Sequence, residues 1–306
     1  MNANEAANLS RLASRRIRAI PEALLSRAAD YLHTRETKSS FAIERLTPGS
    51  RRAATFVELL RLAGTMDVRS GPALVRLQRS IVEERSADSS YRTDRNYIGE
   101  SLGPTREWVR SVPPRPQDLR GLMDGWTATY GRLEKSSVDA VVVAALGGFG
   151  FVFLHPFGDG NRRIHRFLIR HVLAKRGFTP APVVGYRTDE RGEMTALNDT
   201  GALYRFPDLT TQAEALFGFV SVTIETELAA EPVISSAFDA ARRKMIEVVD
   251  MPDRRLDLFI RPHLQGKGRL SAAKRKQFPE LNDAEVDRLE ALGRDELSTM
   301  AEADEE

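Results

Sequence analysis

The chain has 306 residues, with 45 Lys and Arg against 43 Asp and Glu, 42% hydrophobic residues and no cysteine. At roughly 100 to 200 residues per domain, this length predicts two or three compact units with real cores. The lack of cysteine excludes a disulfide scaffold, a cysteine nucleophile and a thiolate metal site, and the hydrophobic share excludes a disordered chain. We expect a cytoplasmic protein, because 1–25 lacks a secretory apolar run and the uncharged stretch 140–154 is too short to span a bilayer.

Helical patterns dominate the chain from end to end. Apolar residues three and four positions apart predict helices over 9–32, 51–63, 71–84, 116–134 and 213–228. Alternating patterns are rare, and they predict one short hairpin, in which Asn96–Gly99 and Arg106–Arg110 flank Gly103-Pro104. The prolines of 111–116 then end regular structure.

The uncharged run 140–154 predicts a buried core helix. Its glycines at 147, 148 and 150 weaken a helix by roughly 1 kcal/mol each relative to Ala. They either permit close packing or mark the end of that helix. Beyond residue 237 the pattern predicts two or three short helices in a small separate domain.

Charge is unevenly distributed although the formal net charge is only +2. Residues 261–276 contain Lys and Arg but no Asp or Glu, whereas 280–306 are strongly acidic. Such a basic stretch attracts nucleic acid, but a solvated loop beside an acidic segment explains it equally well.

One stretch, His155-Pro-Phe-Gly-Asp-Gly-Asn-Arg-Arg-Ile-His-Arg166, concentrates groups that carry chemistry. The apolar spacing after it predicts a helix that begins near Gly160-Asn161. Free backbone N–H groups and the helix dipole favour anions at such a position, and glycine lets the main chain approach phosphate closely. The stretch therefore predicts a phosphate or nucleotide site.

The side chains of this stretch suit such a site. Arg163 and Arg166 are three residues apart, hence on one helical face, where two guanidinium groups grip successive phosphates. Asp159 is a hard oxygen ligand suited to Mg²⁺, and His155 is a natural general base for a hydroxyl nucleophile. His165 and His171 are expected to be structural or solvent-facing.

The same residues resemble the signature of the Fic (Fido) family: His, any, Phe, any, Asp or Glu, Gly, Asn, Gly, Arg, any, any, Arg. All fixed positions but one match. The resemblance extends from about residue 90 to 225. It implies a helical core that transfers AMP from ATP to a hydroxyl side chain of a target protein, with a hairpin flap that aligns the target by strand addition.

The resemblance also implies residue roles. His155 is the catalytic base, Asp159 binds Mg²⁺, and Phe157 anchors the loop. The nucleotide is held by the glycine-asparagine loop and the arginines, with Arg166 on the γ phosphate. The nucleotide-binding residues are thus Gly160, Asn161, Arg162, Arg163 and Arg166.

The expected fold class is all-α, a Fic-type helical core with a short hairpin flap. The expected domains are an N-terminal helical region (1–88), the Fic core (89–230) and a small C-terminal domain (236–306). The last resembles the winged-helix-like appendage of some Fic proteins. Its basic stretch is a candidate for contact with DNA, and the chain is a candidate homodimer.

Ser40-Phe-Ala-Ile-Glu44 resembles the inhibitory motif that many Fic proteins carry on a helix that plugs their own site. A spacing of four places Ser40 and Glu44 on one helix face. The resemblance implies that Glu44 pairs with Arg166 and occupies the γ-phosphate position.

Two departures from the family pattern leave alternatives open. Arg162 replaces the second glycine of the loop, where a long cation either adds a clamp or fills the pocket. The segment after Gly177 is shorter than usual, and Tyr204 either lines the adenine pocket or packs in the core. The alternatives to an autoinhibited adenylyltransferase are a degenerate Fic module that binds nucleotide or partners without turnover, and a Fic enzyme that transfers another phosphate-linked group or removes AMP.

Overall fold

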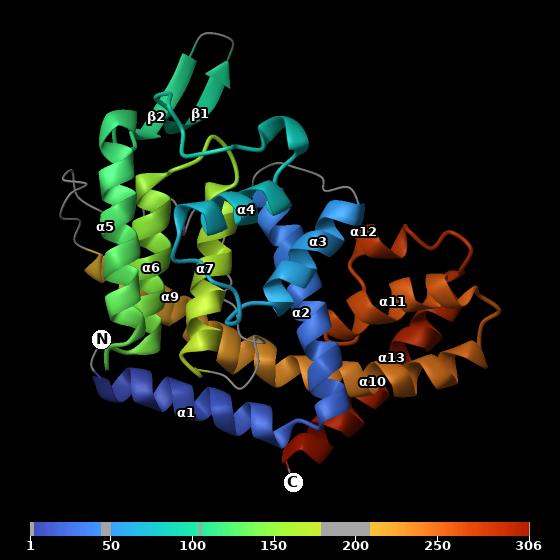
Figure 1. Ribbon diagram of the computed structural model, residues 1–306. Helices are drawn as coiled ribbons and strands as arrows, with labels where there is room; N and C mark the ends of the chain where they lie inside the picture. Colours follow the sequence, from blue (N-terminus) through green and yellow to red (C-terminus); the bar gives the residue numbers. More distant parts are fainter. Residues whose placement is uncertain (1–2, 44–49, 104–105, 179–208, 306) are drawn as a thin grey trace. The chain divides into compact units, whose positions relative to one another are not determined.

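The computed structural model describes residues 3–43, 50–103, 106–178 and 209–305 (Figure 1). The described residues form helices and one two-stranded sheet, which confirms the all-α class with a hairpin. They divide into two compact units, one of residues 1–18 and 29–225 and the other of residues 19–28 and 226–306. Among the described residues, no helix combines the length and the apolar character needed to cross a membrane.

The N-terminal region consists of α1 (Ala3–Ala19), α2 (Glu22–Ile43), α3 (Ser50–Arg61) and α4 (Gly71–Ile81). The single helix expected over 9–32 is wrong, because the chain breaks at Ile20-Pro21. Proline removes a backbone donor and disfavours helical angles in the residue before it. Further along, α4 begins at the capping hydroxyl of Ser70, and a short 3₁₀ turn, Glu84–Ser86, follows it.

The predicted hairpin is present as β1 (Ile98–Gly103) and β2 (Arg106–Ser111), which pair antiparallel. The register shifts between Ile98 and Gly99. A Cβ at Gly99 would lie 2.4 Å from the carbonyl oxygen of Trp108, so this irregular pairing needs a glycine. Trp108 itself is 54% exposed.

Four helices build the core that carries the loop of interest: α5 (Pro116–Glu134), α6 (Ala140–Leu154), α7 (Asn161–Lys175) and α9 (Thr210–Val222). α6 packs against the other three (Figure 1). A Cβ at Gly148 would lie 2.6 Å from Ile169 of α7, and one at Gly147 would lie 3.1 Å from Tyr130 of α5. The glycines of α6 therefore permit close packing, which was one of the two expectations for them.

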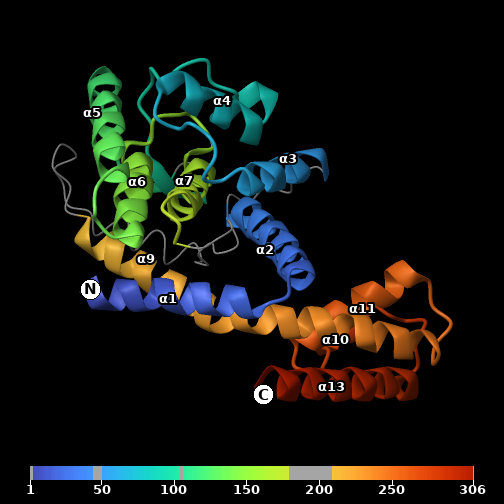
Figure 2. The same ribbon diagram turned by 60° about the horizontal axis from the view of Figure 1, so that its bottom comes forward.

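The second unit contains α10 (Leu228–Ile246), α11 (Asp253–Gln265), α12 (Ala272–Arg275) and α13 (Asp283–Glu305), after a π-helical turn at Thr223–Glu227. Figure 2 shows α10, α11 and α13 packed together. Phe259, Ile260 and Leu289 are fully buried in their shared core. Residues 226–305 are all described and contain no strand, so the winged-helix part of the expectation is not confirmed.

Candidate active site

The loop 155–160 joins α6 to α7 and carries the predicted chemistry. α6 ends at His155, whose φ of 50° and ψ of 58° lie in the left-handed region that non-glycine residues seldom adopt. α7 begins after Gly160, which has a φ of 86° and provides no capping side chain. Gly160 therefore leaves the first backbone N–H groups of α7 without a side-chain cap, at the position where helices bind anions.

Gly160 is required by both its backbone and its surroundings. Its positive φ is strained for any residue with a Cβ, and a Cβ there would lie 2.8 Å from Cγ1 of Val82. The close approach of the loop to the end of α4 thus depends on this glycine.

Asn161 and Phe157 fix the interior of the loop. The Asn161 amide nitrogen donates to the Phe157 carbonyl oxygen at 2.8 Å, and the Phe157 N–H donates to Asn161 Oδ1 at 3.0 Å. Phe157 is fully buried and lies against the rings of Tyr91 and Phe151. Asn161, predicted to bind nucleotide, thus shapes the loop from inside.

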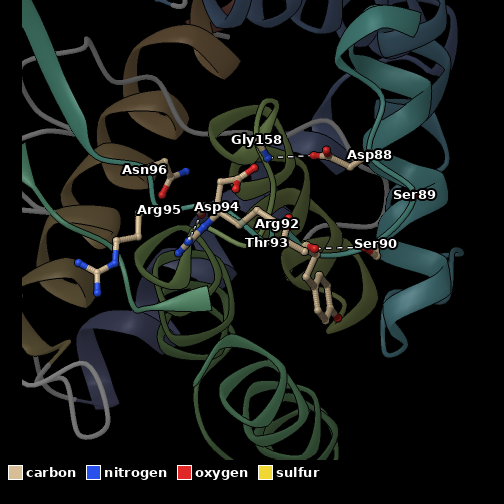
Figure 3. A pocket seen from close by; sticks show the side chains of 10 residues that line it. Asp88, Ser89, Ser90, Arg92, Thr93, Asp94, Arg95, Asn96 and Gly158 are labelled. Atoms are coloured by element: carbon tan, nitrogen blue, oxygen red, sulfur yellow. Dashed lines mark hydrogen bonds between the residues drawn. The ribbon is translucent and has the colours of Figure 1, made fainter. Parts of the chain in front are cut away.

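Gln78 and Asp88 form hydrogen bonds with the backbone of the loop. The Asp88 carboxylate accepts a hydrogen bond from the Gly158 N–H at 2.9 Å (Figure 3). Gln78 is fully buried and donates through Nε2 to the Asp159 carbonyl oxygen at 3.3 Å, while its Oε1 accepts from the Asp88 N–H at 3.0 Å. These bonds connect α4 to the loop.

Arg92 holds the start of the loop. Its guanidinium donates to the carbonyl oxygens of His155 at 2.8 Å, Asp94 at 2.9 Å and Pro114 at 2.6 Å. Its own N–H donates to the Pro156 carbonyl at 2.9 Å. The buried Arg92 guanidinium therefore joins the segments before and after the hairpin to the backbone of His155, the predicted base.

The surroundings of His155 keep its imidazole neutral. Burial lowers its pKa from 6.5 to about 4, and the positive charges of Arg92 and Arg162 act in the same direction. A backbone hydrogen bond with Val152 and the Asp159 carboxylate oppose the shift without cancelling it. A neutral imidazole near pH 7 is the form that a general base requires.

Asp159 lies at the mouth of α7 with its carboxylate partly exposed. Oδ1 accepts from the Gly160 N–H at 2.5 Å and from the Arg163 guanidinium at 2.8 Å. Among the described residues, Oδ2 has no hydrogen-bond partner, and no cluster of three His, Cys, Asp or Glu side chains forms a protein cage for a metal. A single open carboxylate suits Mg²⁺, which keeps several waters and shares phosphate oxygens with its substrate.

The two predicted phosphate clamps are both buried. Arg163 is 1% exposed; its guanidinium donates to the Ile81 carbonyl oxygen at 2.7 Å and to Asp159. Arg166 is 3% exposed, one helical turn further along α7. Arg162, which replaces the family glycine, is partly exposed at the N-terminus of α7. Three arginines therefore lie in the first two turns of α7, and Arg163 also supports Asp159.

Helix α2 lies against the arginine-bearing face of α7. Phe41 packs under the Arg163 guanidinium, 5.2 Å from ring centroid to Cζ, and Glu36 forms an ion pair with buried Arg170. Ser40 is 1% exposed, and its hydroxyl has no hydrogen-bond partner among the described residues. Glu44 lies outside the described residues, as does Tyr204.

A polar cavity of 370 Å³ opens beside the loop (Figure 3). Gly158 forms one wall, and the segment 88–96 that leads into the hairpin forms the rest. In Figure 3 the Arg92 and Asp94 side chains lie centrally, whereas the Arg95 side chain points away from them. The cavity is therefore continuous with the start of the hairpin and with the loop that carries His155.

Sequence reasoning missed Gln78, Asp88 and Arg92 as parts of the site. Their bonds to the loop span 81, 70 and 63 positions of sequence, so no local pattern reveals them. The family resemblance did reach Arg92, but only as part of a matching stretch without a role.

Comparison with known proteins agrees with this geometry. Residues 72–173, from α4 through α7, match the model of the Fic/DOC family. The chain contains a Fic/DOC family domain. The family match covers the loop, its supports and the hairpin, and it confirms the resemblance in the sequence.

Curated relatives of the Fic domain match over a limited stretch. Protein adenylyltransferase Fic of Nematostella vectensis is 35% identical over 69 residues, which are 22% of this chain and 16% of the relative. The protein of the same name from Drosophila grimshawi is 38% identical over 95 residues, 31% of this chain and 20% of the relative. The matches thus span a fifth or less of the lengths of these relatives.

Solved structures show the same fold at low identity. A Fic domain containing signaling protein from Bacteroides thetaiotaomicron aligns with a TM-score of 0.57 and 17% identity, over 74% of this chain and 95% of that one. A Fic family protein from Desulfovibrio desulfuricans aligns with a TM-score of 0.53 and 15% identity, over 92% of this chain and 95% of that one. These likenesses show the fold alone.

Proposed function

We propose that this protein transfers AMP from ATP to a hydroxyl side chain of a target protein. The observation that carries the proposal is a neutral imidazole, His155, on the same loop as an open carboxylate and the uncapped N-terminus of α7. Curated relatives of the Fic domain are named adenylyltransferases, which supports the same reaction class.

In the proposed reaction, His155 accepts the proton of the acceptor hydroxyl as its oxygen attacks the α phosphorus of ATP. The new bond joins that oxygen to the α phosphorus, the bond from the α phosphorus to the bridging oxygen breaks, and pyrophosphate leaves. The N–H groups at the start of α7 and the arginines there stabilise the developing negative charge. Arg166 is proposed to hold the γ phosphate and Arg163 the phosphates nearer the loop.

Asp159 fits the role of the Mg²⁺ ligand, because one carboxylate oxygen is open beside the phosphate position. When bound with ATP, the ion neutralises charge on the phosphates. Arg163 orients the Asp159 carboxylate through its hydrogen bond at 2.8 Å.

The hairpin is proposed to receive the target segment. Its strands pair only with each other among the described residues, so extended backbone edges remain for strand addition. The 370 Å³ cavity between 88–96 and Gly158 adjoins the hairpin and the loop, and it offers room for side chains of the target.

Helix α2 is proposed to inhibit the enzyme. It carries Ser40 and packs against α7 through Phe41 and Glu36, so its C-terminal end is directed to the region of the phosphate-binding arginines. Glu44 follows directly after α2 and is proposed to pair with Arg166 in place of the γ phosphate.

A degenerate module that binds nucleotide without turnover is the second candidate, and Arg162 is the observation that favours it. A side chain stands where the family has a glycine, at the second position after Gly160. Transfer of another phosphate-linked group, or removal of AMP, uses the same residues and is distinguished by the mass of the modification.

The test is incubation of purified protein with Mg-ATP labelled on the α phosphate. Glu44→Gly is expected to increase self-labelling, and His155→Ala to abolish it. A different result would favour the degenerate module: neither the parent protein nor Glu44→Gly labels itself or a target extract, although both bind Mg-ATP, and Arg162→Gly restores labelling.

A further inference from the structure

The second unit presents a basic segment, residues 266–276, that the proposed reaction does not use. Its sequence, Gly-Lys-Gly-Arg-Leu-Ser-Ala-Ala-Lys-Arg-Lys, contains no acid. Lys267, Arg269, Lys274 and Lys276 are exposed, and none of them forms an ion pair with a side chain that the structure describes in this unit. Their charges are therefore available to a partner.

The backbone of this basic segment is firmly held. Arg294 of α13 donates to the Gly268 carbonyl oxygen at 3.0 Å, and a Cβ at Gly268 would lie 2.0 Å from Arg294 Cγ. Leu270 is buried in the core, and its N–H donates to Oε1 of buried Glu290 at 3.0 Å. The backbone that carries the cations is thus already ordered, so little backbone entropy is lost when the segment binds a partner.

The acids nearest to the segment are already neutralised by internal pairs. Glu290 is 3% exposed, and besides the Leu270 N–H it accepts from Arg275 at 2.8 Å. Asp287 also pairs with Arg275, at 3.1 Å. α13 therefore holds the segment in place with its acids, and the solvent-facing side stays basic.

We propose that the basic segment binds the phosphate backbone of a nucleic acid. Phosphate contacts need only exposed cations, whereas protein interfaces need apolar or aromatic anchors and membrane-surface elements need an inserted apolar face. The segment has no aromatic residue, and its one large apolar residue, Leu270, is buried. The helix within the segment, α12, spans only Ala272–Arg275 and is too short to read a groove, so we expect binding that is independent of base sequence.

The salt dependence gives the expected magnitude. Four phosphate contacts predict a slope of about −3.6 for log K against log salt with duplex DNA, or about a 100-fold loss of affinity between 50 and 200 mM. Removal of two cations halves the slope to about −1.8, which leaves roughly a tenfold loss over the same range.

The experiment measures binding of the full chain to labelled mixed-sequence duplex DNA and single-stranded RNA, by fluorescence anisotropy across this salt range. Lys274→Glu/Lys276→Glu is compared with Arg76→Glu/Arg79→Glu, which changes the net charge equally through exposed cations of α4. Lys267→Gln/Arg269→Gln tests the other half of the segment without adding acids. Circular dichroism verifies that each variant is folded.

We expect both variants of the segment to reduce the magnitude of the salt slope by about 2, and the α4 control to leave the slope unchanged. Binding to DNA, to RNA or to both supports the proposal and identifies the source of the phosphates. No binding to either at 50 mM salt overturns it. Equal losses in the segment and control variants also overturn it. None of these outcomes depends on AMP transfer.

Discussion

Replacement of Gly160 by alanine tests the geometry of the loop at its tightest point. A Cβ there is strained at a φ of 86° and lies 2.8 Å from Val82 Cγ1. Left-handed backbone costs about 1–2 kcal/mol per residue, and overpacking adds about 1–3 kcal/mol. The expected loss of stability is therefore roughly 2–5 kcal/mol, equivalent to a fall in Tm of roughly 5–15 °C for a unit of this size.

Gly158→Ala is the matched control in the same loop. A Cβ at Gly158 meets its nearest atom, Asp88 Oδ2, at 3.6 Å, which is an ordinary contact without a positive φ. Thermal unfolding and calorimetric titration with Mg-ATP are measured for both variants. Gly160→Ala is expected to lower Tm and to weaken Mg-ATP binding, whereas Gly158→Ala stays within about 1 kcal/mol of the parent. Equal effects of the two substitutions would refute the reasoning.

Three further predictions follow from the contacts. Arg92→Lys keeps the charge but loses the guanidinium that donates to three carbonyl oxygens. Self-labelling is therefore expected to fall by about tenfold, while the acid limb of the pH profile stays unchanged. An unchanged rate contradicts the positioning role of Arg92. Glu36→Gln weakens the pair with Arg170, so amide exchange in α2 is expected to rise by about tenfold together with self-labelling, and unaltered exchange contradicts the docking of α2. Burial lowers the pKa of His263 to about 4, with Glu290 opposing and Arg294 assisting the shift. As pH falls below about 6.5, His263 is protonated in the unfolded chain but stays neutral in the folded one. The free energy of unfolding therefore drops by about 2 kcal/mol from pH 7 to pH 5. His263→Leu is expected to remove that part of the drop, as measured by urea unfolding.

The sequence predicted those elements that depend on residues close together along the chain. The uncharged run became α6 with the expected bounds, and the paired short strands around Gly103-Pro104 became the hairpin. Pro21 was present in the sequence as a helix breaker, but the strong apolar periodicity on both sides of it led to a single predicted helix. At Pro21 the missing N–H outweighed the pattern, whereas Pro232 and Pro262 lie inside α10 and α11.

The loop was predicted because its groups are contiguous, and its supports were missed because they are not. His155, Asp159 and Asn161 lie within seven consecutive residues, whereas Gln78 and Arg92 reach the loop only through tertiary packing. Sequence spacing also predicted phosphate clamps at Arg163 and Arg166, but it did not predict that both are almost fully buried. The burial of Arg163 depends on α2 and α4, which supply Phe41 and the Ile81 carbonyl from distant parts of the chain.

The central claim is transfer of AMP by His155. The most direct measurement is intact-protein and peptide mass spectrometry of Glu44→Gly after incubation with Mg-ATP, beside Glu44→Gly/His155→Ala. The account predicts a gain equal to one AMP group on a Ser, Thr or Tyr of the first variant and none on the second. An unmodified first variant that still binds Mg-ATP would contradict the account, as would equal modification of both.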